Sequence, residues 1–388
     1  MTYKRLKEMD LSGKSVLLRL DLNAPIQDGI VTNKERLLRS LPTLDYILES
    51  GANLIIMSHL GRPEEDNQFQ KEFSLKPVVK ELEKLLSRTI PLYSLDEIEA
   101  KKNKIQTIIA LENTRFYIGE KTNNSDLSRR FSNLADIFVM DAFATSHRAH
   151  ASTTGVITFS QDACAGLLLD EELNALTKVK QNGNSSIAIL GGSKISTKLG
   201  LIDSLSESMD KVILGGGIAN TCIAAQGFNI GKSLIEKSML KEAEQLSKNP
   251  KIIIPQTVIV SSSPDIPGRE TSIDKISDEE SIFDISPEAL LQIADIITQA
   301  KTILWNGPIG FFEKDNFDKG TMKLADMIAV SSGYTVAGGG DTISAANKAG
   351  VLDKIDYVST AGGAFLEFIE GRTLPAIKAL REKVDLRL

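Results

Sequence analysis

Short apolar runs rich in β-branched residues alternate along this chain with longer segments of helical spacing. Strands that are apolar on both faces and alternate with helices are typical of parallel sheets covered by helices. We therefore expect the α/β class. The expected strands are SVLLRLDL (15–22), NLIIMS (53–58), IIAL (108–111), IFVM (137–140), SIAIL (186–190), KVILG (211–215), KIIIP (251–255), TVIV (257–260), TILW (302–305), YTVA (334–337) and DYVST (356–360). Two expected helices are KPVVKELEKLLSR (76–88) and SPEALLQIADIITQA (286–300).

A change in the residues at the strand ends divides the chain. Before 165–181, which resembles one long helix, the strand ends carry Arg, His, Asp and Asn. After it, beyond the turn-rich NGNSS (182–186), they carry glycine clusters. We expect two Rossmann-like domains, 1–169 and 183–372, joined by a hinge helix at 170–182.

The composition excludes several kinds of protein. The 388 residues carry a net charge of -6 without a basic cluster, which disfavours nucleic-acid binding. Two cysteines do not form a disulfide framework or a zinc site. We find neither an apolar stretch of signal-peptide length at the start nor an apolar run of roughly 20 residues, the length of a membrane span. We expect a cytoplasmic protein that does not bind membranes.

Glycine-rich junctions follow five expected strands of the second half. Ligands bind beyond the carboxyl ends of parallel strands, where glycine exposes backbone N–H groups and a following helix adds its positive end. Any single junction is better explained as a tight turn, but five at the same strand end favour a nucleotide or phosphate site. The junctions are AILGGSKIS (188–196), ILGGGIAN (213–220), LWNGPIGFFE (304–313), VAGGGDTIS (336–344) and STAGGAFLE (359–367).

Two common nucleotide motifs are missing from this half. GFNIGKS (227–233) is one residue too short between its glycines for a Walker A loop, and no junction completes G-x-G-x-x-G. The charged residues near these glycines each have two possible roles. Lys194 and Lys198 are four apart at an expected helix start, and form either a surface pair or an anion site. Asp341 is a helix N-cap or a magnesium ligand.

Cations and amides follow the expected strands of the first half. The three histidines of the chain, His59, His147 and His150, all come just after apolar runs. The arginines near the strand ends are either salt-bridge partners or ligands of an anion. If their guanidinium groups form bidentate hydrogen bonds to one ligand, they bind a small multiply charged anion. The residues in question are Asp21, Asn23, Arg36, Arg62, Arg115 and Arg148. A nucleotide domain and an anion domain together suit phosphoryl transfer, which depends on positioning and charge neutralisation.

Nine motifs in order resemble the phosphoglycerate kinase family along nearly the whole chain. They are RLDLNAP (19–25), SHLGRP (58–63), LENTRF (111–116), DAFATSHRAHAS (141–152), GGSKISTKL (191–199), LGGGIANT (214–221), WNGPIGFFE (305–313), AGGGDT (337–342) and STAGGAFLEFIEG (359–371). The resemblance implies a hinge-bending, monomeric glycolytic enzyme with Mg²⁺ as cofactor. It implies phosphoryl transfer from 1,3-bisphosphoglycerate to ADP, giving 3-phosphoglycerate and ATP. It also implies that segment 373–388 packs back on the first domain.

The resemblance implies roles for individual residues. Those expected to bind 3-phosphoglycerate are Asp21, Leu22, Asn23, Arg36, His59, Leu60, Gly61, Arg62, Arg115 and Arg148. Those expected to bind nucleotide are Gly192, Lys198, Gly216, Asn306, Glu313, Gly339, Gly340, Asp341 and Thr342, with Asp341 also toward Mg²⁺. Those expected near the transferred phosphoryl group are Arg36, Lys194, Lys198, Gly362 and Gly363.

The chain departs from the family pattern at two positions, and two other functions compete. Ala361 stands where the family usually has the first of three glycines, and Ala144 where it usually has glycine. The alternatives are an NAD-dependent dehydrogenase, which lacks its fingerprint here, and a non-enzymatic two-lobed protein that binds a phosphorylated metabolite.

Overall fold

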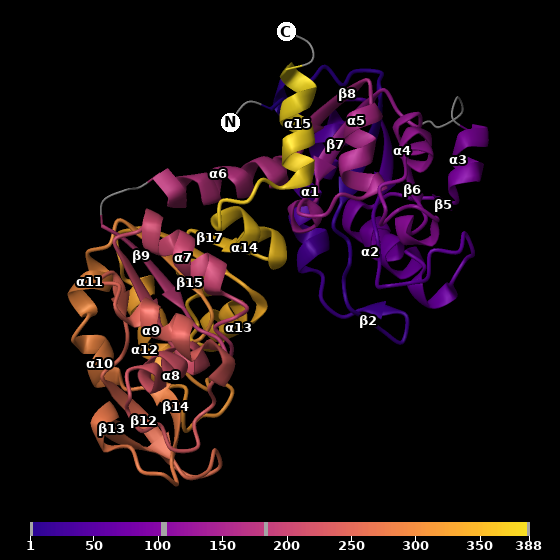
Figure 1. The fold of residues 1–388 in the computed structure, drawn as a ribbon. Helices are drawn as coiled ribbons and strands as arrows, with labels where there is room; N and C mark the ends of the chain where they lie inside the picture. The colour runs from indigo at the N-terminus through magenta and orange to yellow at the C-terminus, as the bar shows by residue number, and fades with distance from the viewer. Residues whose placement is uncertain (1–2, 102–106, 182–184, 386–388) are drawn as a thin grey trace. The chain divides into compact units, whose positions relative to one another are not determined.

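The computed structural model describes residues 3–101, 107–181 and 185–385, and its chain divides into two compact units (Figure 1). Unit 1 comprises Met1–Leu173 with Thr373–Leu388, and unit 2 comprises Asn174–Arg372. The division falls within helix α6 (Leu167–Gln181), so this one helix contributes residues to both units.

A six-stranded parallel sheet forms the centre of unit 1, in the order β5-β6-β4-β1-β7-β8. The strands are β1 (Ser15–Leu20), β4 (Asn53–Met57), β5 (Leu92–Tyr93), β6 (Ile108–Leu111), β7 (Ile137–Asp141) and β8 (Asp162–Ala165), and β2 (Ile26–Gln27) pairs separately with β3 (Ile30–Val31). β6 and β7 are buried throughout, which explains their continuous apolar sequence.

Helices cover this sheet. They are α1 (Glu35–Glu49), α2 (Lys76–Leu86), α3 (Leu95–Lys101), α4 (Ser125–Ser132), α5 (Val156–Phe159) and α15 (Pro375–Asp385), with short helical turns at Leu6–Glu8, Lys71–Phe73, Thr114–Phe116, Phe143–Thr145 and Ala151–Gly155. The expected helix at 76–88 is α2. Its buried Val78 and Leu82 lie on one face, and it ends before Ser87, which has a left-handed backbone (φ 51°).

Unit 2 is built on a second parallel sheet, in the order β11-β10-β9-β15-β16-β17. Its strands are β9 (Ser186–Leu190), β10 (Lys211–Leu214), β11 (Ile252–Ile253), β15 (Thr302–Asn306), β16 (Tyr334–Gly338) and β17 (Tyr357–Ser359). The helices are α7 (Leu199–Ser208), α8 (Gly216–Ala225), α9 (Leu240–Ser247), α10 (Pro287–Leu291), α11 (Ala294–Thr298), α12 (Lys319–Ala329), α13 (Gly340–Lys348) and α14 (Gly363–Ile369), with short turns at Lys237–Met239, Ile273–Lys275 and Leu352–Lys354. The expected α/β class with helix-covered parallel sheets is confirmed.

One expected strand belongs to a different sheet. TVIV (257–260) lies in β12 (Thr257–Ser261), which pairs antiparallel with β13 (Arg269–Ser272) and β14 (Ser281–Ile285). In β12, Val258 and Val260 are buried whereas Thr257 and Ile259 are half-buried. This alternation is typical of an antiparallel sheet with one solvated face, and it was hidden by a run too short to resolve it.

Two helix predictions need correction. Segment 286–300 forms two short helices, α10 and α11, and nothing in its glycine-free sequence explains the break. Lys194 and Lys198 do not lie on a helix, because α7 begins only at Leu199. The preceding residues form a turn in which the Thr197 hydroxyl donates to the Lys194 carbonyl at 2.8 Å.

Each unit has its own core. In unit 1, Leu18 and Leu54 from the central strands pack with Leu37 of α1 and Val78 of α2. In unit 2, the fully buried Trp305 of β15 is the largest core side chain. Among residues 3–101, 107–181 and 185–385, no helix has both the length and the apolar character that crossing a bilayer requires.

Candidate functional site

The five glycine-rich junctions of unit 2 lie at one edge of its parallel sheet. They follow β9, β10, β15, β16 and β17, which are neighbours in that sheet. Helices α8, α13 and α14 begin at Gly216, Gly340 and Gly363 within these junctions. Three helix N-termini are thus gathered at the edge where an anion would be bound. In α8 the Gly216 and Ile218 N–H groups already donate to the Ile309 and Gly192 carbonyls, at 3.0 and 3.2 Å.

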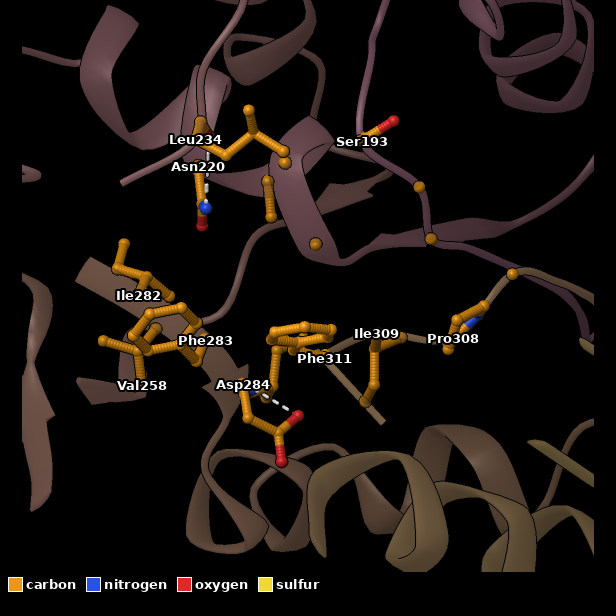
Figure 2. Close-up of a pocket in the computed structure, with 18 of the residues that line it drawn as sticks. Ser193, Asn220, Leu234, Val258, Ile282, Phe283, Asp284, Pro308, Ile309 and Phe311 are labelled. Atoms are coloured by element: carbon orange, nitrogen blue, oxygen red, sulfur yellow. Dashed lines mark hydrogen bonds between the residues drawn. The ribbon is translucent and has the colours of Figure 1, made fainter. Parts of the chain in front are cut away.

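A pocket of about 770 Å³ opens at this edge (Figure 2). Five of the residues expected to bind nucleotide line it, namely Gly192, Lys198, Gly216, Glu313 and Asp341. The other four expected residues, Asn306, Gly339, Gly340 and Thr342, do not line it. Lys194 is exposed and does not line it either.

Two of the residues outside the pocket brace its wall. The Thr342 hydroxyl donates to the Gly338 carbonyl at 2.7 Å and accepts from the Gly307 N–H at 2.7 Å. The Asn306 side-chain amide donates to the same Gly338 carbonyl at 2.6 Å. These bonds tie the end of β15 to the end of β16, so both side chains hold the glycine loops in place.

The glycines of AGGGDT have three different environments. A Cβ on Gly338 would lie 2.5 Å from the Phe365 ring, so close packing requires glycine there. Gly339 has φ 99°, a conformation that L-residues rarely adopt. Gly340 has open space around its Cα and begins α13. Only this third glycine leaves room beside a helix N-terminus.

Lys198 places a half-buried ammonium group beside the glycine loops. Its Nζ donates to the Gly191 carbonyl at 2.6 Å and to both the backbone and the side-chain oxygen of Asn306, at 2.9 and 2.6 Å. Burial lowers the pKa of Lys198 from 10.5 to about 8, and the Asp341 carboxylate opposes this shift. The ammonium therefore remains charged at pH 7, with fixed geometry.

Asp341 is the residue that suits a magnesium ion. Its carboxylate is exposed at the pocket and accepts no hydrogen bond from any described residue. The described parts of the chain hold no group of three or more metal-ligating His, Cys, Asp or Glu side chains. One carboxylate fits Mg²⁺, which usually takes one or two together with phosphate oxygens.

The opposite end of the pocket is apolar and was not predicted from the sequence. Leu234, Val258, Ile282, Phe283 and Phe311 line it (Figure 2). The Phe283 and Phe311 rings stack at 6.2 Å between centroids. Leu234 and Phe311 are 59% and 37% exposed, so apolar surface is available to a ligand. Three of these residues come from the unpredicted antiparallel sheet, which is why local patterns did not reveal them.

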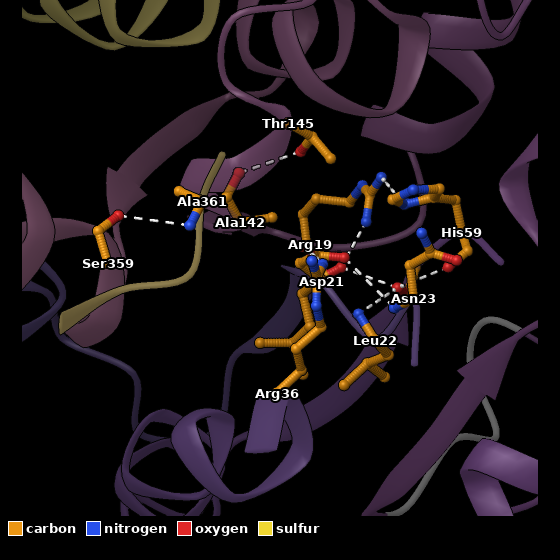
Figure 3. Close-up of polar contacts among 12 residues, drawn as sticks. Arg19, Asp21, Leu22, Asn23, Arg36, His59, Ala142, Thr145, Ser359 and Ala361 are labelled. Atoms are coloured by element: carbon orange, nitrogen blue, oxygen red, sulfur yellow. Dashed lines mark hydrogen bonds and ion pairs between the residues drawn. The ribbon is translucent and has the colours of Figure 1, made fainter. Parts of the chain in front are cut away.

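A second candidate site lies at the strand ends of unit 1 (Figure 3). Asp21, Leu22 and Asn23 follow β1, and His59, Leu60, Gly61 and Arg62 follow β4. Arg115 follows β6, Arg148 follows β7, and Arg36 is in the first turn of α1. Because β6, β4, β1 and β7 are consecutive in the sheet, the structure brings these residues to one edge.

Hydrogen bonds fix the loops of this second site. The Asn23 side-chain oxygen accepts from the Gly61 N–H at 2.9 Å, and Arg115 donates to the Gly61 carbonyl. Arg36 forms an ion pair with Asp21. Arg62 and Arg148 are exposed, and Arg148 Nε contacts His147 Nε2 at 3.2 Å. The guanidinium groups outnumber the acids facing them, so the edge favours an anion.

Sequence reasoning missed Arg19, which is fully buried within β1. Its guanidinium contacts His59 Nδ1 at 3.2 Å, so Nδ1 is the acceptor and the proton of His59 is on Nε2. Burial and the charges of four arginines hold the pKa of His59 well below its usual value. His59 is therefore a neutral donor at pH 7. The signal was visible, since an arginine interrupts the otherwise apolar SVLLRL.

The two departures from the expected pattern are accommodated locally. Ala361 is buried, and its N–H donates to the Ser359 hydroxyl at 3.3 Å (Figure 3). Positive φ falls on Gly362 (φ 54°) and not on Ala361. Ala361 therefore needs no conformation that alanine disfavours. Ala144 lies in the helical turn Phe143–Thr145.

An α/β protein with a glycine-lined pocket in one unit and an arginine-rich strand edge in the other has the parts of a phosphotransferase. A family model described as phosphoglycerate kinase matches residues 6–372. The phosphoglycerate kinase from Coxiella burnetii is 45% identical, with a TM-score of 0.93 over 98% of this chain and 99% of that one. The phosphoglycerate kinase from Pyrococcus horikoshii OT3 is 29% identical, with a TM-score of 0.82 over the same shares.

The chain belongs to the phosphoglycerate kinase family. Its activity is that of a glycolytic kinase with a carboxyl group as acceptor, EC 2.7.2.3, acting on small-molecule substrates with ADP and ATP. This confirms the function expected from the sequence, in preference to the dehydrogenase and the non-enzymatic binding protein.

Proposed function

We propose that the nucleotide binds in the pocket of unit 2 and 3-phosphoglycerate at the arginine edge of unit 1. The observation that carries this proposal is the different chemistry of the two sites. Unit 2 offers backbone N–H groups, Lys198 beside the glycine loops and an apolar wall, which suit phosphates joined to a flat base. Unit 1 offers guanidinium and imidazole donors, which suit a compact anion with a carboxylate and a phosphate.

In unit 2, the triphosphate extends from the apolar wall toward the helix N-termini. The base packs against the apolar residues around Phe283, and Glu313 accepts from the ribose hydroxyls. Gly192, Gly339 and Gly340 leave their N–H groups accessible to phosphate oxygens, and Lys198 adds charge. The Gly216 N–H already donates to the Ile309 carbonyl at 3.0 Å, so Gly216 contributes by lining the pocket without a side chain. Asn306 and Thr342 act through the loops that they brace. Asp341 would hold Mg²⁺, which supplies neutralisation of the phosphate charge when bound.

In unit 1, 3-phosphoglycerate is held by donors from four strand ends. The arginines bind its charged groups and His59 donates through Nε2. Asp21 orients Arg36, while Asn23 orients the backbone of Leu60 and Gly61 through the Gly61 N–H. Leu22 is held by a 3.0 Å hydrogen bond from its N–H to the Ser58 hydroxyl.

The transfer itself needs no general base. In the direction of ATP use, a carboxylate oxygen of 3-phosphoglycerate attacks the γ-phosphorus, and the bond to the β-phosphate oxygen breaks to release ADP. The carboxylate is already ionised at pH 7, because an ordinary carboxyl pKa is about 4. Arg36, Lys194 and the N–H groups at Gly362 and Gly363 stabilise the charge on the transferring group. ATP formation is the reverse.

We further propose that the two units close on each other during the reaction, with α6 as part of the hinge. Closure would align the two ligands and exclude water, which would otherwise hydrolyse the acyl phosphate. The domains that we propose are 1–169 with 373–388 and 183–372, linked by 170–182. The enzyme acts as a cytoplasmic monomer, and it needs neither nucleic acid nor membrane.

A steady-state assay tests this function. Purified protein is supplied with 3-phosphoglycerate, ATP and Mg²⁺, and the formation of 1,3-bisphosphoglycerate is followed. Turnover that depends on all three supports the proposal. Absence of turnover with binding of NAD would contradict it.

A further inference from the structure

Glu120 is a fully buried glutamate beside the arginine edge of unit 1, and the proposed reaction gives it no role. It lies in the loop after β6, and its backbone carbonyl accepts from the Ala151 N–H at 2.9 Å, in the loop after β7. A buried carboxylate is costly unless it is hydrogen-bonded and its charge is compensated by a cation. The partners of the Glu120 side chain therefore indicate its role.

Ser152 connects Glu120 to Arg19. It is also fully buried, in the helical turn Ala151–Gly155. Its N–H donates to Glu120 Oε2 at 2.9 Å, and its hydroxyl donates to Glu120 Oε1. The hydroxyl oxygen in turn accepts from Arg19 Nε at 3.2 Å. Because the only hydroxyl proton of Ser152 is given to the carboxylate, its lone pairs face the guanidinium group.

The same guanidinium group contacts His59, so the series of hydrogen bonds runs from Glu120 to the imidazole (Figure 3). A guanidinium group only donates, which makes Ser152 and His59 Nδ1 its acceptors. Burial lowers the pKa of Arg19 to about 10, and the charge of Glu120 opposes this shift, so Arg19 is a cation at pH 7. Burial raises the pKa of Glu120, and Arg19 and the Ser152 donors oppose that rise. Reversing any bond of the series would leave a donor facing a donor.

We infer that Glu120 is a positioning residue of the 3-phosphoglycerate site, which holds the His59 ring in place as the Nε2–H tautomer through Ser152 and Arg19. The carboxylate compensates and orients the buried cation, and the oriented cation occupies Nδ1 of the ring. Glu120 itself does not touch the substrate. This inference rests on the proposed function, because it takes His59 as a donor to 3-phosphoglycerate.

Glu120→Gln tests this role at nearly constant volume. Glutamine has one side-chain oxygen, whereas Ser152 presents both an N–H and an O–H, so one of these donors would face the glutamine NH₂ group. Arg19 also loses its compensating charge. We expect KM for 3-phosphoglycerate to rise by about tenfold with kcat nearly unchanged, because the loss falls on binding that ground state and transition state share. KM for ATP, which binds unit 2, should stay the same.

Two readouts distinguish positioning from a general loss of stability. In a His59→Ala background, Glu120→Gln should raise KM for 3-phosphoglycerate hardly further, because the ring that it positions is absent. Long-range ¹H–¹⁵N correlation spectra of the imidazole report which ring nitrogen carries the proton. We expect His59 to be the Nε2–H tautomer alone in the wild type and a mixture of tautomers in Glu120→Gln.

Glu83→Gln is the matched control. Glu83 also accepts from a backbone N–H, that of Ile90, at 2.8 Å. Ile90 precedes β5, so this pair lies at the opposite edge of the sheet, and the variant should keep both KM and the His59 tautomer. Should Glu120→Gln fail to fold, Ser152→Ala is taken through the same cycle, because it interrupts the series at the next residue. Should both fail to fold, the tautomer of His59 in the wild type decides.

The outcomes separate this inference from the function beneath it. The role of Glu120 is overturned by an Nδ1–H tautomer in the wild type, by an unchanged KM in Glu120→Gln, or by an equal rise of KM with and without His59. The kinase activity stands in each of these cases. Absence of wild-type turnover with ATP and 3-phosphoglycerate contradicts the proposed function instead.

Discussion

Lys198 Nζ lies 2.6 Å from the side-chain oxygen of Asn306, and the same amide of Asn306 donates to the Gly338 carbonyl at 2.6 Å. One side chain thus links the cation of the nucleotide pocket to the loop at the start of α13. The contact fixes the ammonium group without neutralising it, because an amide carries no charge. The ammonium group of Lys198 is therefore both fixed in position and free to neutralise the charge of a bound anion.

The charge of Lys198 predicts a pH dependence of nucleotide binding. With a pKa of about 8 in the free protein, the lysine loses its proton as the pH rises from 7 to 9. Phosphate favours the charged form, so ADP binding should take up a proton above pH 8 and weaken by about tenfold at pH 9. Calorimetry in two buffers of different ionisation enthalpy measures this uptake. Lys198→Arg, which stays charged, should remove the dependence, and an unchanged dependence in that variant would exclude Lys198 as its source.

The lowered pKa of Lys198 also affects the stability of the free protein, which should increase with pH where nucleotide binding weakens. A lysine whose folded pKa is lowered destabilises the folded state wherever it is protonated, so the effect is complete below pH 8. It fades as the pH rises from about 8 to the unfolded value of 10.5. Without ligand, the free energy of unfolding of Lys198→Met relative to the wild type should therefore be larger at pH 7 than at pH 10. Urea unfolding at both pH values measures this, and an equal difference at both would contradict it.

Lys194 should matter for turnover more than for binding of 3-phosphoglycerate. It is exposed in the turn before α7 and lies outside the nucleotide pocket. If it stabilises the transferring group, Lys194→Ala should lower kcat by about 100-fold. The Kd for 3-phosphoglycerate, which binds unit 1, should hardly change. Lys241→Ala, at an exposed position of α9, is the control and should keep full activity. Intact turnover in Lys194→Ala would remove this lysine from the mechanism.

Arg36 is predicted to act on both substrate binding and chemistry. Its guanidinium is oriented by the ion pair with Asp21 at the substrate edge of unit 1. Arg36→Met should therefore raise KM for 3-phosphoglycerate and lower kcat, each by tenfold or more, given about 2–4 kcal/mol for such charge-stabilising groups. Steady-state kinetics are compared with Arg88→Ala, an exposed arginine just after α2. Equal kinetics in the two variants would show that Arg36 is only a surface ion pair.

Two neighbouring glycines should respond differently to alanine. Gly338→Ala places a methyl group 2.5 Å from the Phe365 ring and should lower the free energy of unfolding by about 1–3 kcal/mol. Gly340→Ala has open space at the first residue of α13 and should cost nothing in stability. Its methyl group should instead weaken nucleotide binding, by blocking access to the helix N-terminus. Thermal unfolding and ADP titration of both variants separate the two effects, and equal destabilisation would contradict the assignment.

The parallel part of the fold could be predicted because its information is local. An apolar run such as IIAL is continuous when both faces of a strand are buried, and every strand of a parallel sheet ends at the same edge. The glycine junctions and the arginines could therefore be assigned to two edges before the structure was known.

The remaining features depend on distant contacts. The antiparallel sheet that supplies Val258, Ile282 and Phe283 to the pocket pairs the expected strand TVIV with β13 and β14, whose mixed sequences, such as RETS, show no local strand pattern. The contact of Arg19 with His59 joins residues 40 positions apart. The loop position of Lys194 also escaped prediction, because spacing alone does not show where a helix begins.

Hydrogen exchange tests the central claim, which assigns one ligand to each unit. Backbone exchange is followed by mass spectrometry for the free protein, with ADP alone and with 3-phosphoglycerate alone. We predict that ADP slows exchange around 191–198 and 338–342 in unit 2, and that 3-phosphoglycerate slows exchange around 58–62 and 113–116 in unit 1. If both ligands slowed exchange in the same unit, the assignment of one ligand to each unit would be wrong.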